Sequence, residues 1–234
     1  MTFIHAFDFM GHNAGLLWHK SLEHMALSAV SVAIALAIAL PVGLWLGHLH
    51  RGSFLAVNIP NIGRALPSLA VLAIGIAWLG VGKENVVVAL VILAVPPVIT
   101  NAWVAVDGVD RDAVEAARGM GMRPSQIFLE VELPLALPLT FAGIRTAAVY
   151  VVATATLAGF FGGGALGDII ANQASYGLDG VVAAAIVVAV LALATDVLLA
   201  GAEWLVTPRG LRGDTELVGG AADYEAARTA PETA

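Results

Sequence analysis

The chain has 234 residues, of which 59% are hydrophobic and only 12% are charged, and its formal net charge is −7. Soluble domains average about 45–50% apolar and about 25% charged residues, so this composition, with a mean hydropathy of +0.87, excludes an ordinary water-soluble enzyme. The absence of cysteine excludes disulfide frameworks, thiolate nucleophiles and cysteine-ligated metal centres. The negative charge does not favour a nucleic-acid partner. We therefore expect an integral membrane protein in contact with the lipid bilayer.

Five apolar runs are long enough to cross a bilayer core, which needs about 20 helical residues. They are residues 25–46, 54–79, 86–106, 135–161 and 181–206. The second run is long and is interrupted by Pro60, Gly63, Arg64 and Pro67, so it also fits two shorter segments. We predict an all-α membrane bundle of five spans, with six spans as the alternative.

Lysine and arginine are distributed unequally between the two sides of this five-span arrangement. One side receives only Lys20 and Lys83. The other side receives Arg51, Arg111, Arg118, Arg123, Arg209 and Arg212. Because short cytoplasmic loops are enriched in these residues, we predict a multi-pass protein of the cell membrane (inner or plasma), with its N-terminus outside and its C-terminus inside. Residues 1–24 are then extracytoplasmic, residues 25–212 form the transmembrane domain, and residues 213–234 form a polar tail that we expect to be disordered.

The loop between the third and fourth runs, residues 107–134, holds the most specific pattern in the chain. Residues 110–118 have the acidic start and the length of a short helix. Gly119 and Gly121 follow, at the kind of place where a positive φ is needed. Pro124 suits the first position of a second short helix. We predict a compact knob of two short helices joined by a glycine turn, facing the cytoplasm.

The second short helix of the knob precedes the fourth span. Pro134 and Pro138 follow it in the sequence. Because a proline removes a backbone donor and crowds the preceding turn, these two residues mark the point where the chain re-enters the membrane.

In this loop the chain resembles the EAA loop of ABC importer permeases. The residues that carry the resemblance, at the family's spacing, are Glu115, Ala116, Ala117, Gly121, Val131, Leu133 and Pro134. The family usually has isoleucine where this chain has Val131. In that family the loop is a coupling helix that docks into a groove of the ATP-hydrolysing subunit. The resemblance implies that Glu115 hydrogen-bonds this partner, that the two alanines allow close approach, and that Gly121 sets the turn.

The resemblance narrows to the osmoprotectant branch, whose permeases import glycine betaine, choline, carnitine or proline betaine. The similar stretches are residues 66–70, 115–122, 131–138, 142–147 and 154–168. This likeness implies the transmembrane bundle of a type I ABC importer. Its partners would be ABC ATPase subunits, a second permease subunit (identical or a sister) and an extracytoplasmic substrate-binding protein. No cofactor would bind this chain, because ATP and Mg²⁺ would bind the ATPase. Methionine-type permeases share much of this outline, so a methionine or other amino-acid importer is the alternative.

Two ionisable residues lie at similar depth inside the fourth and fifth runs. At helical rise, Arg145 lies about 14 Å and Asp196 about 15 Å from the inner end of its run. Charges inside a membrane are costly and are usually paired or placed in a cavity, so we predict an ion pair, with Arg64 as the rival partner. We weigh a structural pair above a contact with substrate. Glu203 lies close to the inner end of the fifth run, and we expect it to reach water.

Two other classes of protein compete with the importer subunit. An ATP-independent secondary transporter or channel would be favoured by inverted repeats, which the sequence does not show. An intramembrane enzyme needs a nucleophile and a base at depth, but we expect all six histidines at interfaces or in water. The segment from Gly80 to Glu84 lacks both the earlier glycine and the hydroxyl of a nucleotide-binding loop. We therefore expect no ATP hydrolysis by this chain, no catalytic residue and no metal site.

Overall fold

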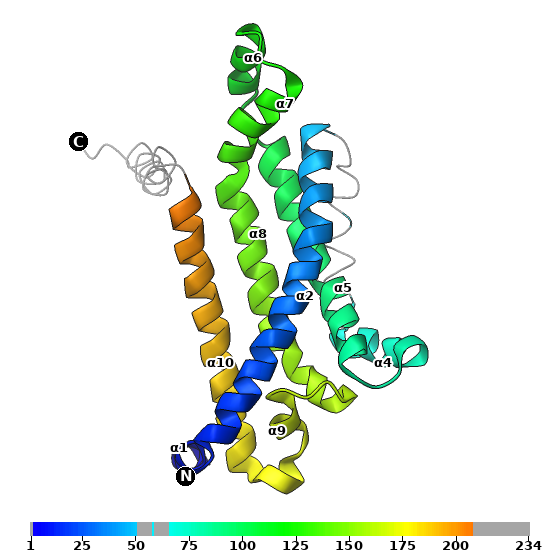
Figure 1. Ribbon diagram of the computed structural model, residues 1–234, viewed down its shortest axis with the longest axis vertical. Coiled ribbons are helices and arrows are strands. Elements are labelled where there is room, and N and C mark those ends of the chain that lie inside the picture. Colours follow the sequence, from blue (N-terminus) through cyan, green and yellow to red (C-terminus); the bar gives the residue numbers. More distant parts are fainter. Residues whose placement is uncertain (1, 51–57, 59–65, 208–234) are drawn as a thin grey trace, which may run out of the picture.

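A computed structural model describes residues 2–50, 58 and 66–207 of the chain (Figure 1). Within these ranges every regular element is a helix. Stretches long and apolar enough to cross a membrane are Ala14–His48, Lys83–Asp107, Pro124–Phe161 and Gln173–Val206. All of them run along the long axis of the molecule (Figure 1). The all-α membrane bundle predicted from the sequence is confirmed.

The elements follow one another along the chain with short connections. They are α1 (Thr2–His12), α2 (Ala14–His48), α4 (Ser68–Leu79), α5 (Lys83–Asp107), α6 (Arg111–Gly119), α7 (Pro124–Gln126), the π-helix η1 (Ile127–Glu132), α8 (Leu133–Thr154), the 3₁₀ helix η2 (Ala155–Phe161), α9 (Gly167–Ala171) and α10 (Gln173–Val206). Helices α6 and α7 form one end of the molecule, which we call the α6 end (Figure 1). Helices α1 and α9 lie at the opposite end, the α9 end.

The second predicted span is represented by α4, which covers only its last part. Its 12 residues extend about 18 Å at helical rise, less than the thickness of a bilayer core. The first part of that run, with Arg64, lies outside the described residues, as does the polar tail from residue 213.

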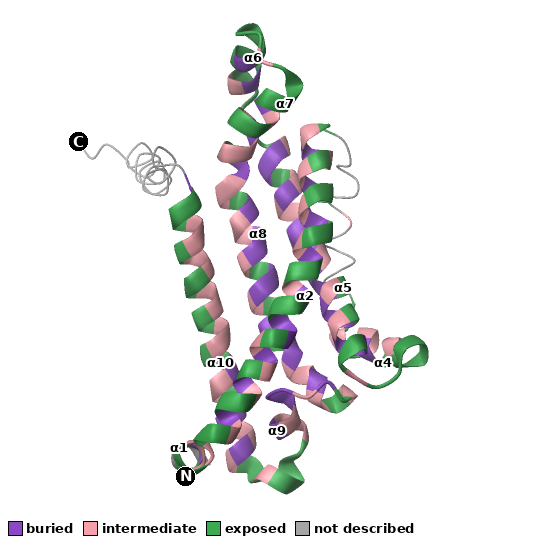
Figure 2. Cartoon of the chain, viewed as in Figure 1, coloured by how far each residue is buried: buried purple, intermediate pink, exposed green. Residues whose placement is uncertain are grey.

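The core of the bundle is the three-helix packing of α5 between α2 and α8. Buried residues concentrate on the facing sides of these helices (Figure 2). Two glycines of α2 allow it to lie close to α5. A Cβ on Gly43 would lie 2.8 Å from the Cβ of Ala102, and one on Gly47 would lie 2.8 Å from the Cβ of Val106. The four-residue spacing of these glycines therefore packs α2 against α5 within one chain.

Helix α10 is attached to the rest mainly near the α9 end. There its buried Ala184 and Val188 pack with Leu17 of α2 and with Leu166 and Ile169 around α9. The helix is interrupted at Gly177, which has φ 67°. Toward the α6 end most of α10 is exposed or half-buried (Figure 2). Its exposed apolar side chains include Leu193, Val197, Leu198 and Leu205.

The first span is longer than predicted, because α2 begins at Ala14 rather than near residue 25. The added turns are not a solvated leader. They carry Leu17, which is buried against α9 and α10, and Lys20, which reaches Asp168. Tertiary contacts made far along the chain thus extend the helix beyond its apolar run.

The second short helix of the knob continues into the fourth span without a break. Pro124 begins a helical stretch that continues through η1 and α8 and ends as η2 at Phe161. Pro134 and Pro138 lie within it. The π-helical turn of η1 ends at Glu132, two residues before Pro134. Its i→i+5 spacing is wider than that of an α-helix, so we infer that it gives the proline ring the room that an α-helical turn would deny.

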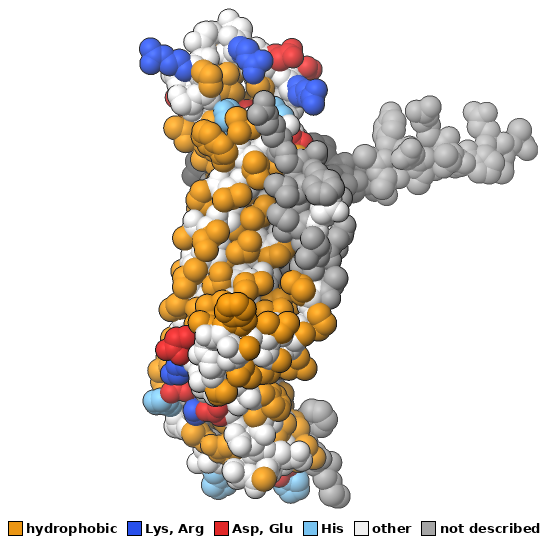
Figure 3. Space-filling view, turned by 90° about the vertical axis from the view of Figure 1, so that its right-hand side faces the viewer, with side chains coloured by type: hydrophobic (Ala, Val, Ile, Leu, Met, Phe, Trp, Pro, Cys, Tyr) orange, Lys and Arg blue, Asp and Glu red, His pale blue; other side chains and the backbone are white. Residues whose placement is uncertain are grey.

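The surface has the pattern of a membrane protein. On the face in Figure 3 hydrophobic side chains cover the middle of the molecule, and charged side chains gather toward its two ends. Together with the long apolar helices, this pattern identifies an integral membrane protein.

Candidate functional site

The knob at the α6 end is built on capping interactions that its sequence dictates. Asp110 precedes α6, and its Oδ1 accepts the backbone N–H of Asp112 at 2.9 Å. After the helix, Gly121 adopts φ +82° as predicted, whereas Gly119 is the last residue of α6 and does not have a positive φ, which corrects the prediction for that residue. The N–H of Gly121 donates to the carbonyl of Arg118 at 3.0 Å, and that of Met122 donates to Ala117 at 3.2 Å. This paired closure of the last turn needs a left-handed residue, which glycine provides.

The two alanines of the resemblance differ in their burial. Glu115 and Ala116 are exposed, as is Gly121. Ala117 is 1% exposed and packs with Val114 and Ile127 in the core of the knob. Only Ala116 is therefore available for close contact with another protein.

The remaining predicted residues form the stem that joins the knob to α8. Val131, Leu133 and Pro134 are half-buried. Between them, Glu132 is 2% exposed, and its Oε2 lies 2.5 Å from Nδ1 of His48 at the end of α2. The predicted set thus divides into an exposed tip and a stem fixed to α2.

Sequence reasoning missed one exposed residue at the tip. Met120 is 76% exposed and lies between Gly119 and Gly121. Burial of this apolar side chain against another protein would stabilise a complex. The position of Met120 between two glycines was the available signal.

The histidines are not all interfacial or solvated, which corrects the sequence prediction. His24 is fully buried, and its Nε2 lies 2.8 Å from the carbonyl oxygen of Val152. In an α-helix this carbonyl would accept from residue 156, which instead belongs to the tighter η2. His24 therefore satisfies the carbonyl at the change of helix type. At the other end of α2, His50 lies 2.9 Å from Asp107.

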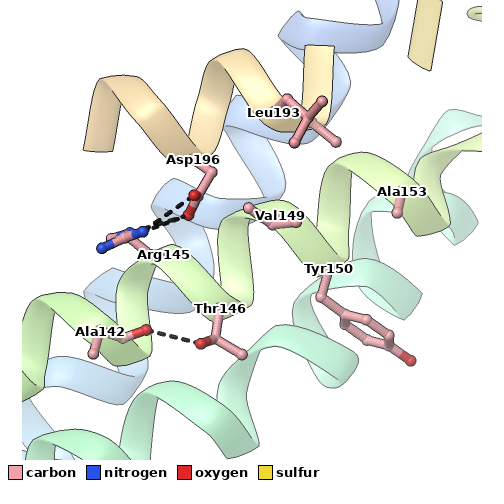
Figure 4. A pocket seen from close by; sticks show the side chains of 9 residues that line it. Ala142, Arg145, Thr146, Val149, Tyr150, Ala153, Leu193 and Asp196 are labelled. Carbon is pink, nitrogen blue, oxygen red and sulfur yellow. Dashed lines mark hydrogen bonds and ion pairs between the residues drawn. The ribbon is translucent and has the colours of Figure 1, made fainter. Parts of the chain in front are cut away.

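Arg145 of α8 and Asp196 of α10 lie together between these two helices (Figure 4). The guanidinium donates through Nε to Oδ1 at 3.0 Å and through Nη2 to Oδ2 at 3.1 Å. This is the bidentate geometry that makes arginine–carboxylate pairs strong. The third nitrogen, Nη1, donates to Oε2 of Glu203 at 3.3 Å. The prediction that Glu203 simply reaches water was wrong, because the long arginine side chain reaches two turns along α10.

A groove of about 630 Å³ lies beside this ion cluster, between α8 and α10. Its lining residues are Ala142, Arg145, Thr146, Val149, Tyr150, Ala153, Ala192, Leu193 and Asp196. Figure 4 shows the side chains of Arg145 and Asp196 directed toward each other, while the ring of Tyr150 points away from the pair. The groove therefore combines apolar walls with one charged edge.

A second ion cluster at the α9 end was not anticipated. Nζ of Lys20 donates to Oδ2 of Asp168 at 2.8 Å and to Oε2 of Glu23 at 3.2 Å. The same carboxylate of Glu23 accepts the backbone N–H of Ala165 at 3.3 Å. These contacts join α2 to the segment around α9. Lys20 and Asp168 are 148 residues apart in the chain, so no local pattern pointed to their contact.

Comparison with known proteins gives consistent results along most of the chain. The family described as "Binding-protein-dependent transport system inner membrane component" matches residues 39–203. The choline transport system permease protein OpuBB of Bacillus subtilis (strain 168) is 39% identical over 214 residues, which are 91% of this chain and 99% of that protein. The glycine betaine/carnitine/choline transport system permease protein OpuCB of the same organism is 39% identical over 89% of this chain and 97% of its own. A chain of the inward-facing MetNI methionine ABC transporter superposes with a TM-score of 0.72 at 25% identity, covering 83% of this chain and 98% of that chain.

Proposed function

Because the chain belongs to the family of binding-protein-dependent transport system inner membrane components, we propose that it is the membrane-spanning permease subunit of an ATP-driven ABC importer for osmoprotectants. The substrates would be glycine betaine, choline, carnitine or proline betaine. The observation that carries this proposal is the 39% identity to permeases named for choline and for glycine betaine, carnitine and choline. The methionine alternative rests on structural likeness at 25% identity and has weaker support.

In this function the α6 end faces the cytoplasm. Arg111, Arg118 and Arg123 all lie on the knob, and positive charge favours the cytoplasmic side. The α9 end and the N-terminus would then lie outside the cell membrane (inner or plasma). The extracytoplasmic binding protein would release substrate at the α9 end.

The exposed tip of the knob would dock on the ATPase subunit. Glu115 would supply a charge-assisted hydrogen bond, Ala116 would allow close approach, and Met120 would enter an apolar part of the partner's groove. ATP and Mg²⁺ would bind the ATPase, and this chain would perform no hydrolysis.

The stem explains how movement at the tip would reach the membrane. From Pro124 to Phe161 the chain is one helical stretch, so a displacement of the knob is passed directly to α8. The contact between the half-buried His48 and the buried Glu132 would transfer the same displacement to α2. The spans would rock between outward-facing and inward-facing states as the ATPase opens and closes. A second permease subunit, identical or a sister, would complete the pathway.

Co-purification with the ATPase subunit encoded in the neighbouring gene tests the coupling role. Glu115→Lys reverses the charge at the tip, and Gly121→Val forces a side chain into φ +82°, at a cost of roughly 1–2 kcal/mol. Both variants are expected to lose at least about tenfold in captured ATPase, which corresponds to about 1.4 kcal/mol of binding free energy. Matched controls are Glu130→Lys on the stem and Gly119→Val, where an added Cβ meets no atom within 4 Å.

The controls are expected to capture ATPase like the wild type. Equal losses in all four variants would mean that the knob is disrupted nonspecifically, and the assignment of the tip would be withdrawn. Failure of the wild type to bind any ATPase would overturn the importer proposal in favour of an ATP-independent transporter. Uptake of radiolabelled choline and glycine betaine, but not methionine, by the reconstituted complex tests the substrate class.

A further inference from the structure

We propose that the groove between α8 and α10 is a transient binding site on the transport path, which we call the station. There the excess negative charge of the Arg145–Asp196–Glu203 cluster binds the quaternary ammonium group of the substrate. This inference rests on the proposed function, and it assigns a binding role to residues that a purely structural ion pair would not need.

The first observation is a count of charge. One guanidinium faces two carboxylates, at 3.0 and 3.1 Å for Asp196 and 3.3 Å for Glu203, so within the part of the chain that the structure describes the cluster carries one negative charge in excess. Among the described residues, Arg145 is the cation within hydrogen-bonding distance of these carboxylates. An uncompensated charge in a spanning helix is costly, and it attracts a mobile cation.

The second observation is the place where this charge lies. Charged residues of spanning helices face the interior or a water-filled cavity rather than lipid. A groove of about 630 Å³ borders the cluster, within the range of about 300–1,000 Å³ typical of small-molecule sites. Asp196 is both a lining residue of the groove and a member of the cluster, and its side chain remains 39% exposed. The excess charge is therefore accessible from the groove.

The chemistry of the groove suits a trimethylammonium group. Such a group has no N–H to donate and keeps its positive charge at every pH, so it needs an anion and apolar walls rather than hydrogen-bond acceptors. Ala142, Val149, Ala153 and Leu193 supply apolar walls beside the carboxylate. Choline, glycine betaine and carnitine share this group.

The arginine gives the station a suitable strength. A transported ion must bind well enough to enter and weakly enough to leave. Arg145 engages both carboxylates and thereby reduces their attraction for the passing cation without cancelling it. A zwitterion such as glycine betaine also brings its own carboxylate, which can accept from the guanidinium. Choline has none and depends on the excess charge alone.

The test uses the complete importer in proteoliposomes with saturating binding protein, and it measures initial uptake of radiolabelled choline and glycine betaine. Glu203→Gln and Asp196→Asn each bring the cluster to zero net charge from a different position, while Glu203→Asp keeps the charge. Glu84→Gln, an exposed carboxylate at the start of α5, is the matched control. ATP hydrolysis by the substrate-free complex reports assembly.

Both neutral variants are expected to lose about tenfold in choline uptake, the effect of one charge at an intermediate dielectric, and less for glycine betaine. Glu203→Asp and Glu84→Gln are expected to retain at least half of the uptake, and substrate-free ATP hydrolysis is expected to stay within about twofold of the wild type. If the wild type transports only one of the two compounds, the loss of uptake of that compound tests the proposal. If Glu203→Gln does not assemble, Asp196→Asn tests it instead.

Two results would overturn the station. The first is wild-type uptake in both neutral variants. The second is equal loss in Glu203→Asp and Glu203→Gln, which would indicate a steric role. A wild-type complex that carries no quaternary ammonium compound would instead refute the proposed function itself, and the station with it.

Discussion

Two ion clusters of the same composition lie in different parts of this molecule. At the α9 end, Lys20 contacts Glu23 and Asp168. Between α8 and α10, Arg145 contacts Asp196 and Glu203. Each cluster places one basic side chain against two carboxylates and joins two helical segments that are distant in sequence. Their surroundings differ in nearby positive charge and in access to a groove. This difference supports a structural role for the first cluster and the proposed binding role for the second.

The cluster at the α9 end has additional positive partners. Glu23 also accepts the N–H of Ala165 at 3.3 Å. A Cβ built on Gly164 would lie 3.6 Å from Oε2 of Glu23 and 3.8 Å from Cε of Lys83, so a second lysine borders the same carboxylates. Among the described residues, no second lysine or arginine forms an ion pair with the carboxylates of the Arg145 cluster, and this cluster borders a groove. A cluster whose negative charges are balanced by nearby positive charges stabilises the fold, whereas a cluster with excess negative charge beside a groove can bind a cationic ligand.

The largest effect is expected when the deep cluster loses its cation. Arg145→Ala leaves two carboxylates facing each other inside the membrane, and breaking a buried pair in this way costs about 3–5 kcal/mol. The three side chains are 23–39% exposed, so water screens their charges. We therefore expect a loss of unfolding free energy at the lower end of this range, about 3 kcal/mol. Thermal unfolding in detergent is expected to shift downward by roughly 6–12 °C.

A combined variant shows whether charge causes this loss. Arg145→Ala with Asp196→Asn and Glu203→Gln removes every charge of the cluster, and it is expected to recover most of the stability of the wild type. If the combined variant unfolds as early as Arg145→Ala alone, the packing of the arginine stem, rather than its charge, stabilises the contact between α8 and α10.

A smaller loss is expected at the α9 end. Lys20→Ala removes two charge-assisted hydrogen bonds, at 2.8 and 3.2 Å, but leaves Ala165 and Lys83 beside the carboxylates. We expect a cost of about 2 kcal/mol, within the range for hydrogen bonds to charged groups. Lys83→Ala is the matched control and is expected to cost less, since no hydrogen bond from Lys83 to the cluster is formed in the structure. Thermal unfolding of the two variants measures these costs. A loss of stability in Lys20→Ala as large as that in Arg145→Ala would contradict the distinction between the two clusters.

The comparison also shows which contacts a sequence can reveal. Arg145 and Asp196 stood out because single charges at equal depth in apolar runs are costly unless they meet. Glu203 lies close enough to a span end to be read as solvated, and only the reach of the arginine brings it into the cluster. Lys20 and Asp168 lie in polar segments, where a charge needs no explanation, so their pairing carried no signal.

In the knob, too, local features could be predicted from the sequence and tertiary contacts could not. The glycine turn and the acidic start of α6 were readable because capping is local. The direction of Ala117, into the core, depends on contacts with Val114 and Ile127 that form only after the turn closes. The continuity of the stem into α8 was hidden because a proline is normally a helix breaker, and the π-helical turn that accommodates Pro134 has no sequence signature of its own.

The smallest effect on stability is expected at Glu203, and it distinguishes the two clusters most sharply. Glu203→Gln removes the weaker contact of Arg145, at 3.3 Å, and leaves the bidentate pair with Asp196 intact and electrically neutral. Neutralising an excess charge also relieves repulsion between the two carboxylates, so the net change in unfolding free energy is expected within about 0.5 kcal/mol. Thermal unfolding beside Lys20→Ala measures it. A destabilisation equal to that of Lys20→Ala would make Glu203 a structural latch, whereas an unchanged stability together with reduced choline uptake means that its charge is retained for the substrate.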